Sequence, residues 1–513
     1  MILALAAFAG PLVVLLVMPV LLVPSSALAA WPTKPRVNLT ICKESGAQKW
    51  PALVGDGSGG AIVIWEDQRG ADWDVYAQHV LPTGAVDPAW PAAGRSLCLT
   101  TGDQCDPRII TDDHGGAIIV WVDHRGDCWQ VYAQHLLATG VVDSSWPSGR
   151  ALCSADSNQT RPRMVGDGAG GAIVSWLDSR HGALQNAIAA QHLLASGALD
   201  PAWPAEGRVV CEVGASRSED REMWIQLFIM DQVTLDMVGD GSGGAIFVWD
   251  AKRDSNWDVR AQHVLSNGQL DDAWPASGRI FFASAADQRR PVIITDGAHG
   301  AIVAWEEQRG DARGVYAQHL QAAGALDPAW PSEGRLVSTP DDAAVLAALV
   351  GDGVGGALVT WGGTRHAVQH LLPTGALDPA WPKEGCRLSD YFGDGFFKLV
   401  ADGVGGAIVV WSRELDGFHF SFKEGRYMTH EGDIYAQHVL GRGVVDPSWP
   451  KRGLAVSSAK GRQFSPVAVE DDAGGAIVVW DDWRADDLVR GTYWGDVFAQ
   501  RVQSNGKLGG GPR

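Results

Sequence analysis

The chain has 513 residues, of which 46% are apolar, and carries a formal net charge of −19 at pH 7. None of the first 30 residues is charged, so the acidic excess belongs entirely to the remainder. Because binding to phosphate groups requires a positive footprint, this balance excludes nucleic acid as an expected partner. Cationic ligands, divalent ions and neutral glycans stay open as ligand classes.

Residues 1–30 form an apolar run that ends in small residues at Ala27 and Ala29. This pattern predicts a secretory signal peptide cleaved near Ala29 or Ala30. The usual basic start is absent, and about 22 apolar residues are enough to span a bilayer, so a retained membrane anchor is the alternative. We expect an exported monomer, secreted or at the cell surface, with no membrane contact after cleavage.

The segment from Gly115 to Leu137 is the unit from which the chain is built, because it recurs eight times. Each copy leads through a Gly-Gly-Ala-Ile-like segment to a tryptophan, and the tryptophans follow one another at 56, 55, 73, 56, 56, 50 and 69 residues. They are Trp65, Trp121, Trp176, Trp249, Trp305, Trp361, Trp411 and Trp480. A period near 56 residues is the size of one propeller blade.

Four short strands are predicted in one unit, at residues 107–112, 116–122, 130–137 and 149–153. The second strand is apolar at nearly every position, which indicates cover on both of its faces. Four-stranded antiparallel sheets stacked around an axis supply that cover. The sequence therefore predicts an all-β, eight-bladed β-propeller.

The ends of the chain indicate how the ring closes. The last unit stops after its third strand, at residues 496–503, while residues 36–42 match the outer-strand segment at 95–98. An N-terminal strand should therefore complete the eighth blade and remove its open edge. Residues 31–513 are predicted to form a single domain.

Most repeated residues are expected to have structural roles. Burying each repeat tryptophan contributes about 4–6 kcal/mol as an upper estimate, so these residues are predicted core. A second set precedes a proline and should fasten the loop to the outer strand: Trp31, Trp90, Trp146, Trp203, Trp274, Trp330, Trp381 and Trp449. Acid-x-Arg pairs such as Asp67 with Arg69 suggest ion pairs between blades.

Two repeated patterns resemble metal sites. Asp-Gly turns such as Asp56 to Gly60 are explained by hairpins with glycine at positive φ, with structural calcium as the less favoured alternative. The repeated histidines lie on different blades and cannot share one ion, so neither a metal nor another cofactor is expected. They are His79, His135, His192, His263, His319, His370 and His438.

The seven cysteines are an odd number for an exported chain. Cys105 precedes the first strand of blade 2 and Cys128 lies before its third, so both should reach one face of the sheet. We predict a Cys105–Cys128 disulfide. Cysteines on the outer strands of different blades are expected to act as small apolar residues.

Three insertions interrupt the repeat, at residues 214–234, 412–432 and 481–495. All should lie on one face of the ring, beside a notch where blade 6 is shortened between Trp361 and His366. Two interpretations are equally open, a ligand-binding surface or an apolar plug. The predicted ligand-binding residues are Phe418, His419, Phe420, Arg426, Tyr427, His430, Trp483, Arg484, Tyr493 and Trp494.

The Gly-Gly-Ala-Ile-Val-Val-Trp, Asp-x-Arg and Asp-Val-Tyr-Ala-Gln-His series resembles repeats of exported bacterial proteins, over residues 31 to 503. This resemblance implies a propeller and no particular activity. The Asp-Gly turns also resemble the aspartate boxes of sialidases, which would give catalytic roles to Tyr427, Glu431 and Asp486. The Thr374 to Trp381 pattern faintly resembles quinoprotein dehydrogenases, but no adjacent cysteine pair exists to cover a quinone.

We expect a non-enzymatic propeller that binds a glycan or an extracellular protein through the face with the insertions. The first alternative is a sialidase-like glycoside hydrolase that uses the same face. The second alternative is a structural role in the cell envelope. Fold alone does not choose among them.

Overall fold

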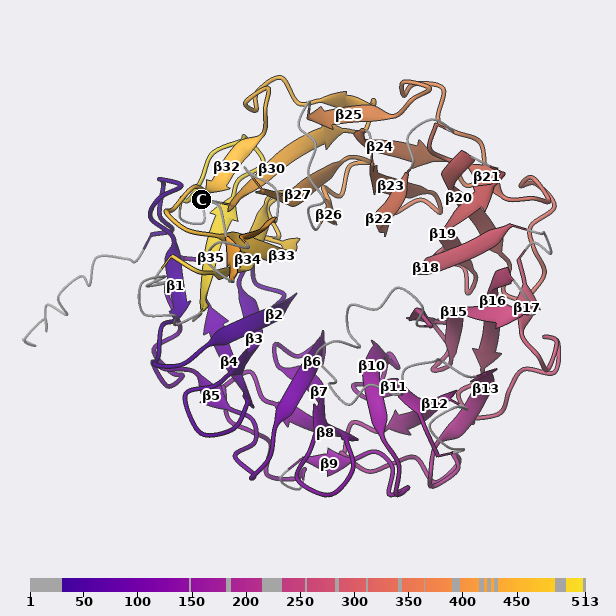
Figure 1. Cartoon of the computed structure of the whole chain (residues 1–513), viewed down its shortest axis with the longest axis horizontal. Coiled ribbons are helices and arrows are strands. Elements are labelled where there is room, and N and C mark those ends of the chain that lie inside the picture. The colour runs from indigo at the N-terminus through magenta and orange to yellow at the C-terminus, as the bar shows by residue number, and fades with distance from the viewer. Residues whose placement is uncertain are drawn as a thin grey trace, which may run out of the picture.

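A computed structural model describes residues 30–146, 149–180, 186–214, 233–253, 256–281, 286–310, 312–339, 344–363, 365–389, 397–414, 419–421, 426–428, 432–484 and 495–510. The described residues form strands and no helix, arranged as a ring of eight blades with the first strand of each blade nearest the axis (Figure 1). This confirms the predicted all-β, eight-bladed propeller.

Each blade is an antiparallel sheet whose strands follow one another outward. Blades 1 to 3 contain β2 (Gln48–Gly55), β3 (Ala61–Asp67), β4 (Asp74–Val80), β5 (Arg95–Ser96); β6 (Gln104–Thr111), β7 (Ala117–Asp123), β8 (Gln130–Leu136), β9 (Arg150–Ala151); and β10 (Gln159–Gly166), β11 (Ala172–Asp178), β12 (Asn186–Leu193), β13 (Arg208–Gly214). Blades 4 to 6 contain β14 (Leu235–Gly239), β15 (Ala245–Arg253), β16 (Asn256–Val264), β17 (Arg279–Ile280); β18 (Asp287–Thr295), β19 (Ala301–Arg309), β20 (Ala312–Leu320), β21 (Arg335–Leu336); and β22 (Val345–Gly351), β23 (Ala357–Gly362), β24 (His366–Leu371), β25 (Cys386–Ser389).

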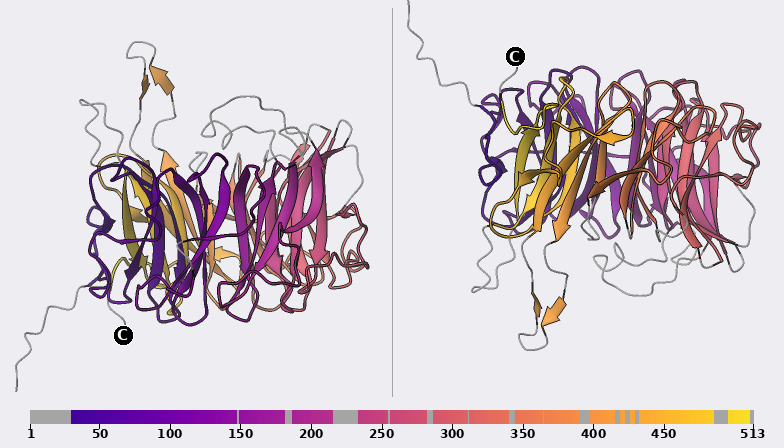
Figure 2. Two further views of the ribbon diagram at one scale, coloured as in Figure 1. Left: turned by 90° about the horizontal axis from the view of Figure 1, so that it is seen from below. Right: turned by 90° about the horizontal axis from the view of Figure 1, so that it is seen from above.

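Blades 7 and 8 depart from this plan. Blade 7 contains β26 (Phe397–Ala401), β27 (Ala407–Glu414), β30 (Gly432–Leu440), β31 (Val444–Val445) and β32 (Leu454–Ser457). Between its second and third strands a separate hairpin, β28 (His419–Ser421) and β29 (Arg426–Met428), stands out from one face of the disc (Figure 2). Blade 8 contains β33 (Gln463–Glu470), β34 (Ala476–Asp482), β35 (Asp496–Val502) and, as its outer strand, β1 (Leu39–Cys42).

Ring closure occurs as predicted. β1 pairs antiparallel with β35, with Leu39 opposite Ala499 and Thr40 opposite Phe498. The N-terminal segment thus supplies the fourth strand that the last repeat lacks, and it covers the edge of β35.

The core lies between the blades. On β3, Ile62 and Ile64 pack against blade 2, while Val63 and Trp65 pack against blade 8. Every residue of this strand is buried, because each face of the sheet meets a neighbouring sheet. The tryptophans of the repeat are core residues, as predicted.

The second set of tryptophans joins successive blades. Trp31 donates from its indole nitrogen to the carbonyl oxygen of Pro82 at 3.0 Å, and Trp203 donates to that of Ser266 at 2.9 Å. Each ring also lies against a glycine of the next blade; a Cβ atom added at Gly197 would come within 2.6 Å of the Trp146 ring. These tryptophans therefore stabilise contacts between blades as well as their own loops.

The predicted Cys105–Cys128 disulfide is wrong, because all seven cysteines are described and all are free. Cys105 pairs with Val122 across β6 and β7, whereas Cys128 precedes β8, one strand farther out. Strands two places apart are separated by about 10 Å, which exceeds the reach of a disulfide.

The predicted ion pairs between blades are also corrected. Arg69 turns back on Asp67 of its own blade, at 2.9 Å from Nε and 2.6 Å from Nη2. The indole nitrogen of Trp65 donates to the same carboxylate at 2.8 Å, and the guanidinium lies over the Tyr76 ring. An arginine that follows an aspartate by two residues reaches this aspartate more easily than it reaches a carboxylate in another blade.

Candidate functional site

A pocket of about 470 Å³ occupies the mouth of the central channel on one face of the ring. Its walls come mainly from the first residues of β2, β22, β26 and β33 and from the β23–β24 hairpin. First strands begin on the face where second strands end, and the described ends of all three insertions meet this same face. We call it the insertion face.

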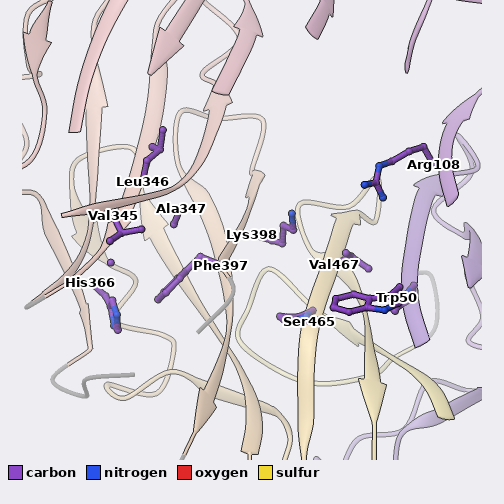
Figure 3. Close-up of a pocket in the computed structure, with 14 residues that line it drawn as sticks. Trp50, Arg108, Val345, Leu346, Ala347, His366, Phe397, Lys398, Ser465 and Val467 are labelled. Carbon is purple, nitrogen blue, oxygen red and sulfur yellow. The ribbon is translucent and has the colours of Figure 1, made fainter. Parts of the chain in front are cut away.

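The shortened hairpin of blade 6 forms one wall of the pocket. Gly362, Gly363 and His366 line it where other blades carry longer loops, so the predicted notch exists. The His366 ring is buried against the Phe397 ring, with 4.7 Å between centroids. Across the pocket lie Trp50 and Arg108 (Figure 3).

Trp50 is placed by a β-bulge that five blades share. It follows the buried Gln48 by two residues, precedes Pro51, and has a φ of 54°. The register of β2 with β3 shifts at this point. The equivalent bulge residues in the other four blades are Asp106, Arg161, Arg290 and Ser465. Left-handed backbone at non-glycine residues is costly and is often found at functional sites.

Carboxylates of the preceding blade hold two of these bulges in place. Glu66 accepts from the amide nitrogen of Asp106 at 2.7 Å, and Asp250 accepts from that of Arg290 at 3.0 Å. Burial raises the pKa of Glu66 to about 7, although Lys49 at 3.5 Å opposes the shift. These carboxyls are buried beneath the bulges, so they position the inner strands and do not line the pocket.

Only part of the predicted ligand-binding set is described. His419, Phe420, Arg426 and Tyr427 belong to the β28–β29 hairpin, for which the strands but not the side chains are described. Trp483 lies edge-on to Phe464, with 5.1 Å between ring centroids. The remaining predicted residues lie outside the described part of the chain: Phe418, His430, Tyr493, Trp494 and the catalytic candidates Glu431 and Asp486.

Arg484 is bound by its own blade and the N-terminal segment. Its Nε lies 2.8 Å from Asp482, and its Nη2 donates to the side-chain oxygen of Asn38, also at 2.8 Å. Because these contacts belong to ring closure, Arg484 has a structural role in addition to any contact with a ligand.

The repeated histidines form clamps on the opposite face. His79 lies between Asp56, at 2.9 Å from Nε2, and Asp87, at 2.8 Å from Nδ1. The other Asp56 oxygen accepts from the amides of Ser58 and Gly60. The hairpin interpretation of these turns therefore accounts for the aspartate, and no group of three or more metal-ligating side chains was found among the described residues.

Trp50, Arg108 and Lys398 line the pocket but are not among the residues predicted from the sequence. A signal for Trp50 was present, because Gln-x-x-Pro recurs in five blades and its third residue varies among tryptophan, aspartate, arginine and serine. The insertions interrupt the repeat and are visible in the sequence, whereas these three positions keep the length of the repeat and change only the side chain.

No family model and no curated protein matches this chain. Several solved structures resemble it. An ulvan lyase, bound to a glucuronic acid–rhamnose 3-sulfate unit, aligns over 94% of this chain and 97% of its own, with a TM-score of 0.45 and 9% identity. An α-L-arabinanase from Penicillium chrysogenum aligns over 93% and 100%, with a TM-score of 0.35 and 9% identity.

A puromycin-hydrolyzing peptidase from Mycobacterium tuberculosis aligns over 88% of this chain, with a TM-score of 0.43 and 13% identity. This chain spans 61% of that peptidase's length. Likeness at such identities concerns the fold alone. The expectation of a non-enzymatic binding propeller is corrected here: the lyase and the arabinanase that share this fold are named as enzymes, and a binding role without activity has no counterpart among the structures described above. No helix able to cross a membrane was found in the described ranges.

Proposed function

We propose that this protein is an enzyme that cleaves a glycan in the pocket on the insertion face. The observation that carries the proposal is the set of side chains around the pocket, which combines an indole, an imidazole and two cationic groups around about 470 Å³. This volume falls in the range of small-ligand sites. The half-buried indole of Trp50 offers a stacking surface for a sugar ring.

Cleavage of a glycosidic bond needs a proton donor for the leaving oxygen and a base or nucleophile nearby. His366 is the side chain of the described lining whose ordinary pKa suits proton transfer near neutral pH. Tyr427, Glu431 and Asp486 stay proposed participants, because they belong to insertions whose ends reach the same face. We also propose that the enzyme acts outside the cytoplasm, on the basis of residues 1–30.

The test is a panel of polysaccharides incubated with the full chain, with products identified by mass spectrometry. His366→Gln and Tyr427→Phe should each lower the cleavage rate by about 10²–10⁴-fold. Trp50→Ser, which places the serine of blade 8 at the equivalent bulge, should weaken substrate binding by about tenfold.

His124→Gln is the matched control, because His124 stacks on Trp129 in blade 2 and does not line the pocket. It should retain the rate of the parent protein. Absence of cleavage across neutral and acidic glycans, or equal loss of rate in the control, would count against the proposal.

A further inference from the structure

One position of the repeat carries charge in half of the blades. On the innermost strand of every blade, one residue pairs with the residue that directly precedes the core tryptophan. These eight residues are Ala52, Arg108, Arg163, Asp236, Val292, Ala348, Lys398 and Val467. Because they share one register, they lie at one height along the channel, and we call them the charged tier.

The charge of this tier is unbalanced. It contains three cations and one acid, although the protein as a whole is strongly acidic. Asp236 accepts from the amide nitrogen of Ile293 at 3.1 Å, so its carboxylate is partly occupied. Lys398 belongs to blade 7 and Arg163 to blade 3, and these blades lie opposite each other in a ring of eight. The cations of the tier therefore lie on both sides of the channel.

Lys398 is exposed to the channel and forms no hydrogen bond or ion pair with the described residues. The carboxylate of Asp236, in the same tier, attracts it without a direct contact. Arg163 donates to the carbonyl oxygen of Pro162 at 3.0 Å, which supplies no negative charge. Arg108 alone of the three has a close carboxylate, that of Asp106 at 2.6 Å.

Burial and mutual repulsion act on these cations together. The protein around the channel keeps water away from the Lys398 ammonium group and so lowers its pKa; the charges of Arg108 and Arg163 lower the pKa further, and Asp236 opposes the shift. Burial likewise lowers the pKa of Arg163 to about 10, with Arg108 adding to the shift. Three cations that share one acid within the tier are only partly neutralised, which is costly, and a bound anion would relieve that cost.

The charged tier opens into the pocket. Arg108 and Lys398 both line it, and Figure 3 shows their side chains extending into the same space from different strands. Trp50 lies beside them on the pocket wall. A stacking surface next to paired cations suits a sugar ring that bears a negative group.

We infer that the charged tier binds an anionic group, carboxylate or sulfate, on a sugar residue of the glycan substrate, with Lys398 and Arg108 as the contacting cations. This inference rests on the proposed function and names its substrate class as an acidic glycan. Arg163 lies at the same height and strengthens the positive potential from the neighbouring blade.

Calorimetric titration of the full chain with charged and uncharged forms of the same oligosaccharide tests the inference. The carboxylate pair is an oligogalacturonide and its methyl ester, and the sulfate pair is a carrageenan oligosaccharide and its desulfated form. One charged member should bind at least about tenfold more tightly than its neutral partner, and that pair identifies the group. Lys398→Gln should remove most of the difference and leave the neutral partner unaffected.

Lys507→Gln is the control, since it removes an equal charge from an exposed turn on the other face. The inference is overturned if the charged and neutral members of both pairs bind equally, or if neither charged member binds. It is also overturned if Lys398→Gln and Lys507→Gln have equal effects. Cleavage of a glycan without preference for charge would overturn it while the proposed function stands. Binding through Lys398 without cleavage of any glycan would instead count against the proposed function.

Discussion

At the scale of single residues, the clamp of one histidine between two aspartates is the main polar device of this protein. Burial alone would lower the pKa of His263, but the hydrogen bonds that its ring donates to Asp240 and Asp271 outweigh this effect and raise the pKa above its ordinary value. Burial would raise the pKa of Asp240, yet His263 and two backbone amides lower it. The two shifts favour the charged form of both partners.

These shifts determine the pH range in which a clamp stabilises the fold. The contribution of His263 is fully present below the pKa of the unfolded chain, about 6.5, and is lost as pH rises through the raised folded value. The contribution of Asp240 is present above about pH 3.8 and is lost as pH falls through its lowered folded value. A clamp is therefore most stabilising in mildly acidic solution.

We predict that His263→Gln lowers the free energy of unfolding by about 2 kcal/mol near pH 5.5, because a charge-assisted hydrogen bond is lost. The difference from the parent protein should shrink near pH 8.5. Denaturant unfolding at the two pH values measures it. His263→Arg is the second variant to measure. In blade 8 the position of the repeated histidine is occupied by Arg501, whose Nε lies 2.7 Å from Asp471. Because arginine stays charged at both pH values, the stability of this variant should depend less on pH. A constant difference at both pH values would refute this account.

At the scale of elements, each blade is joined to the next by a tryptophan ring that lies on a glycine. Gly197 has a φ of 77° and the Trp146 ring within 2.6 Å of where a Cβ would lie. Gly168 has a φ of 76° and nothing within 4 Å. Replacing Gly168 therefore tests the cost of left-handed backbone alone, whereas replacing Gly197 adds the cost of a steric clash with the Trp146 ring.

We predict that Gly168→Ala costs about 1 kcal/mol of stability, from left-handed backbone alone, and that Gly197→Ala costs about 2–4 kcal/mol, because the ring must also move. Thermal and denaturant unfolding of the two variants give the comparison. Equal losses would show that the tryptophan accommodates the added methyl group and that the close contact is unimportant.

The elements of this fold were largely predictable, whereas their charged inner surface was not. A fixed period and an apolar second strand are properties of local sequence, so the strands near Trp121 were located to within a few residues. The disulfide prediction failed because two cysteines on the same face of the ring can still be two strands apart within the sheet, as Cys105 and Cys128 are. Lys398 and Arg108 went unnoticed because a single substitution in an inner strand leaves the repeat unchanged.

At the scale of the whole molecule, stability depends on the two ends of the chain meeting in blade 8. Trp31 is buried against blade 1, and Ile41 lies in the core between blades 8 and 1. Without β1, the edge of β35 would be exposed to other chains. The ring is therefore closed by contacts separated by almost the full length of the sequence.

We predict that deletion of residues 31–42 lowers the free energy of unfolding by more than about 4 kcal/mol, since it removes a buried tryptophan and a covering strand. It should also promote aggregation, which light scattering detects. A synthetic peptide of residues 31–44 added to the truncated chain should restore stability. A truncated chain as stable and as soluble as the parent would contradict the role assigned to β1.

The sequence by itself determined the number of blades, the order of the strands and the way the ring closes, because each follows from repetition and from a strand missing at one end and present at the other. Only the tertiary structure decided which side chains meet in the channel. Arg108, Arg163 and Lys398 lie far apart in sequence, and their common height depends on the register of three separate sheets. Charge that converges around an axis is a property of the closed ring, not of any one repeat.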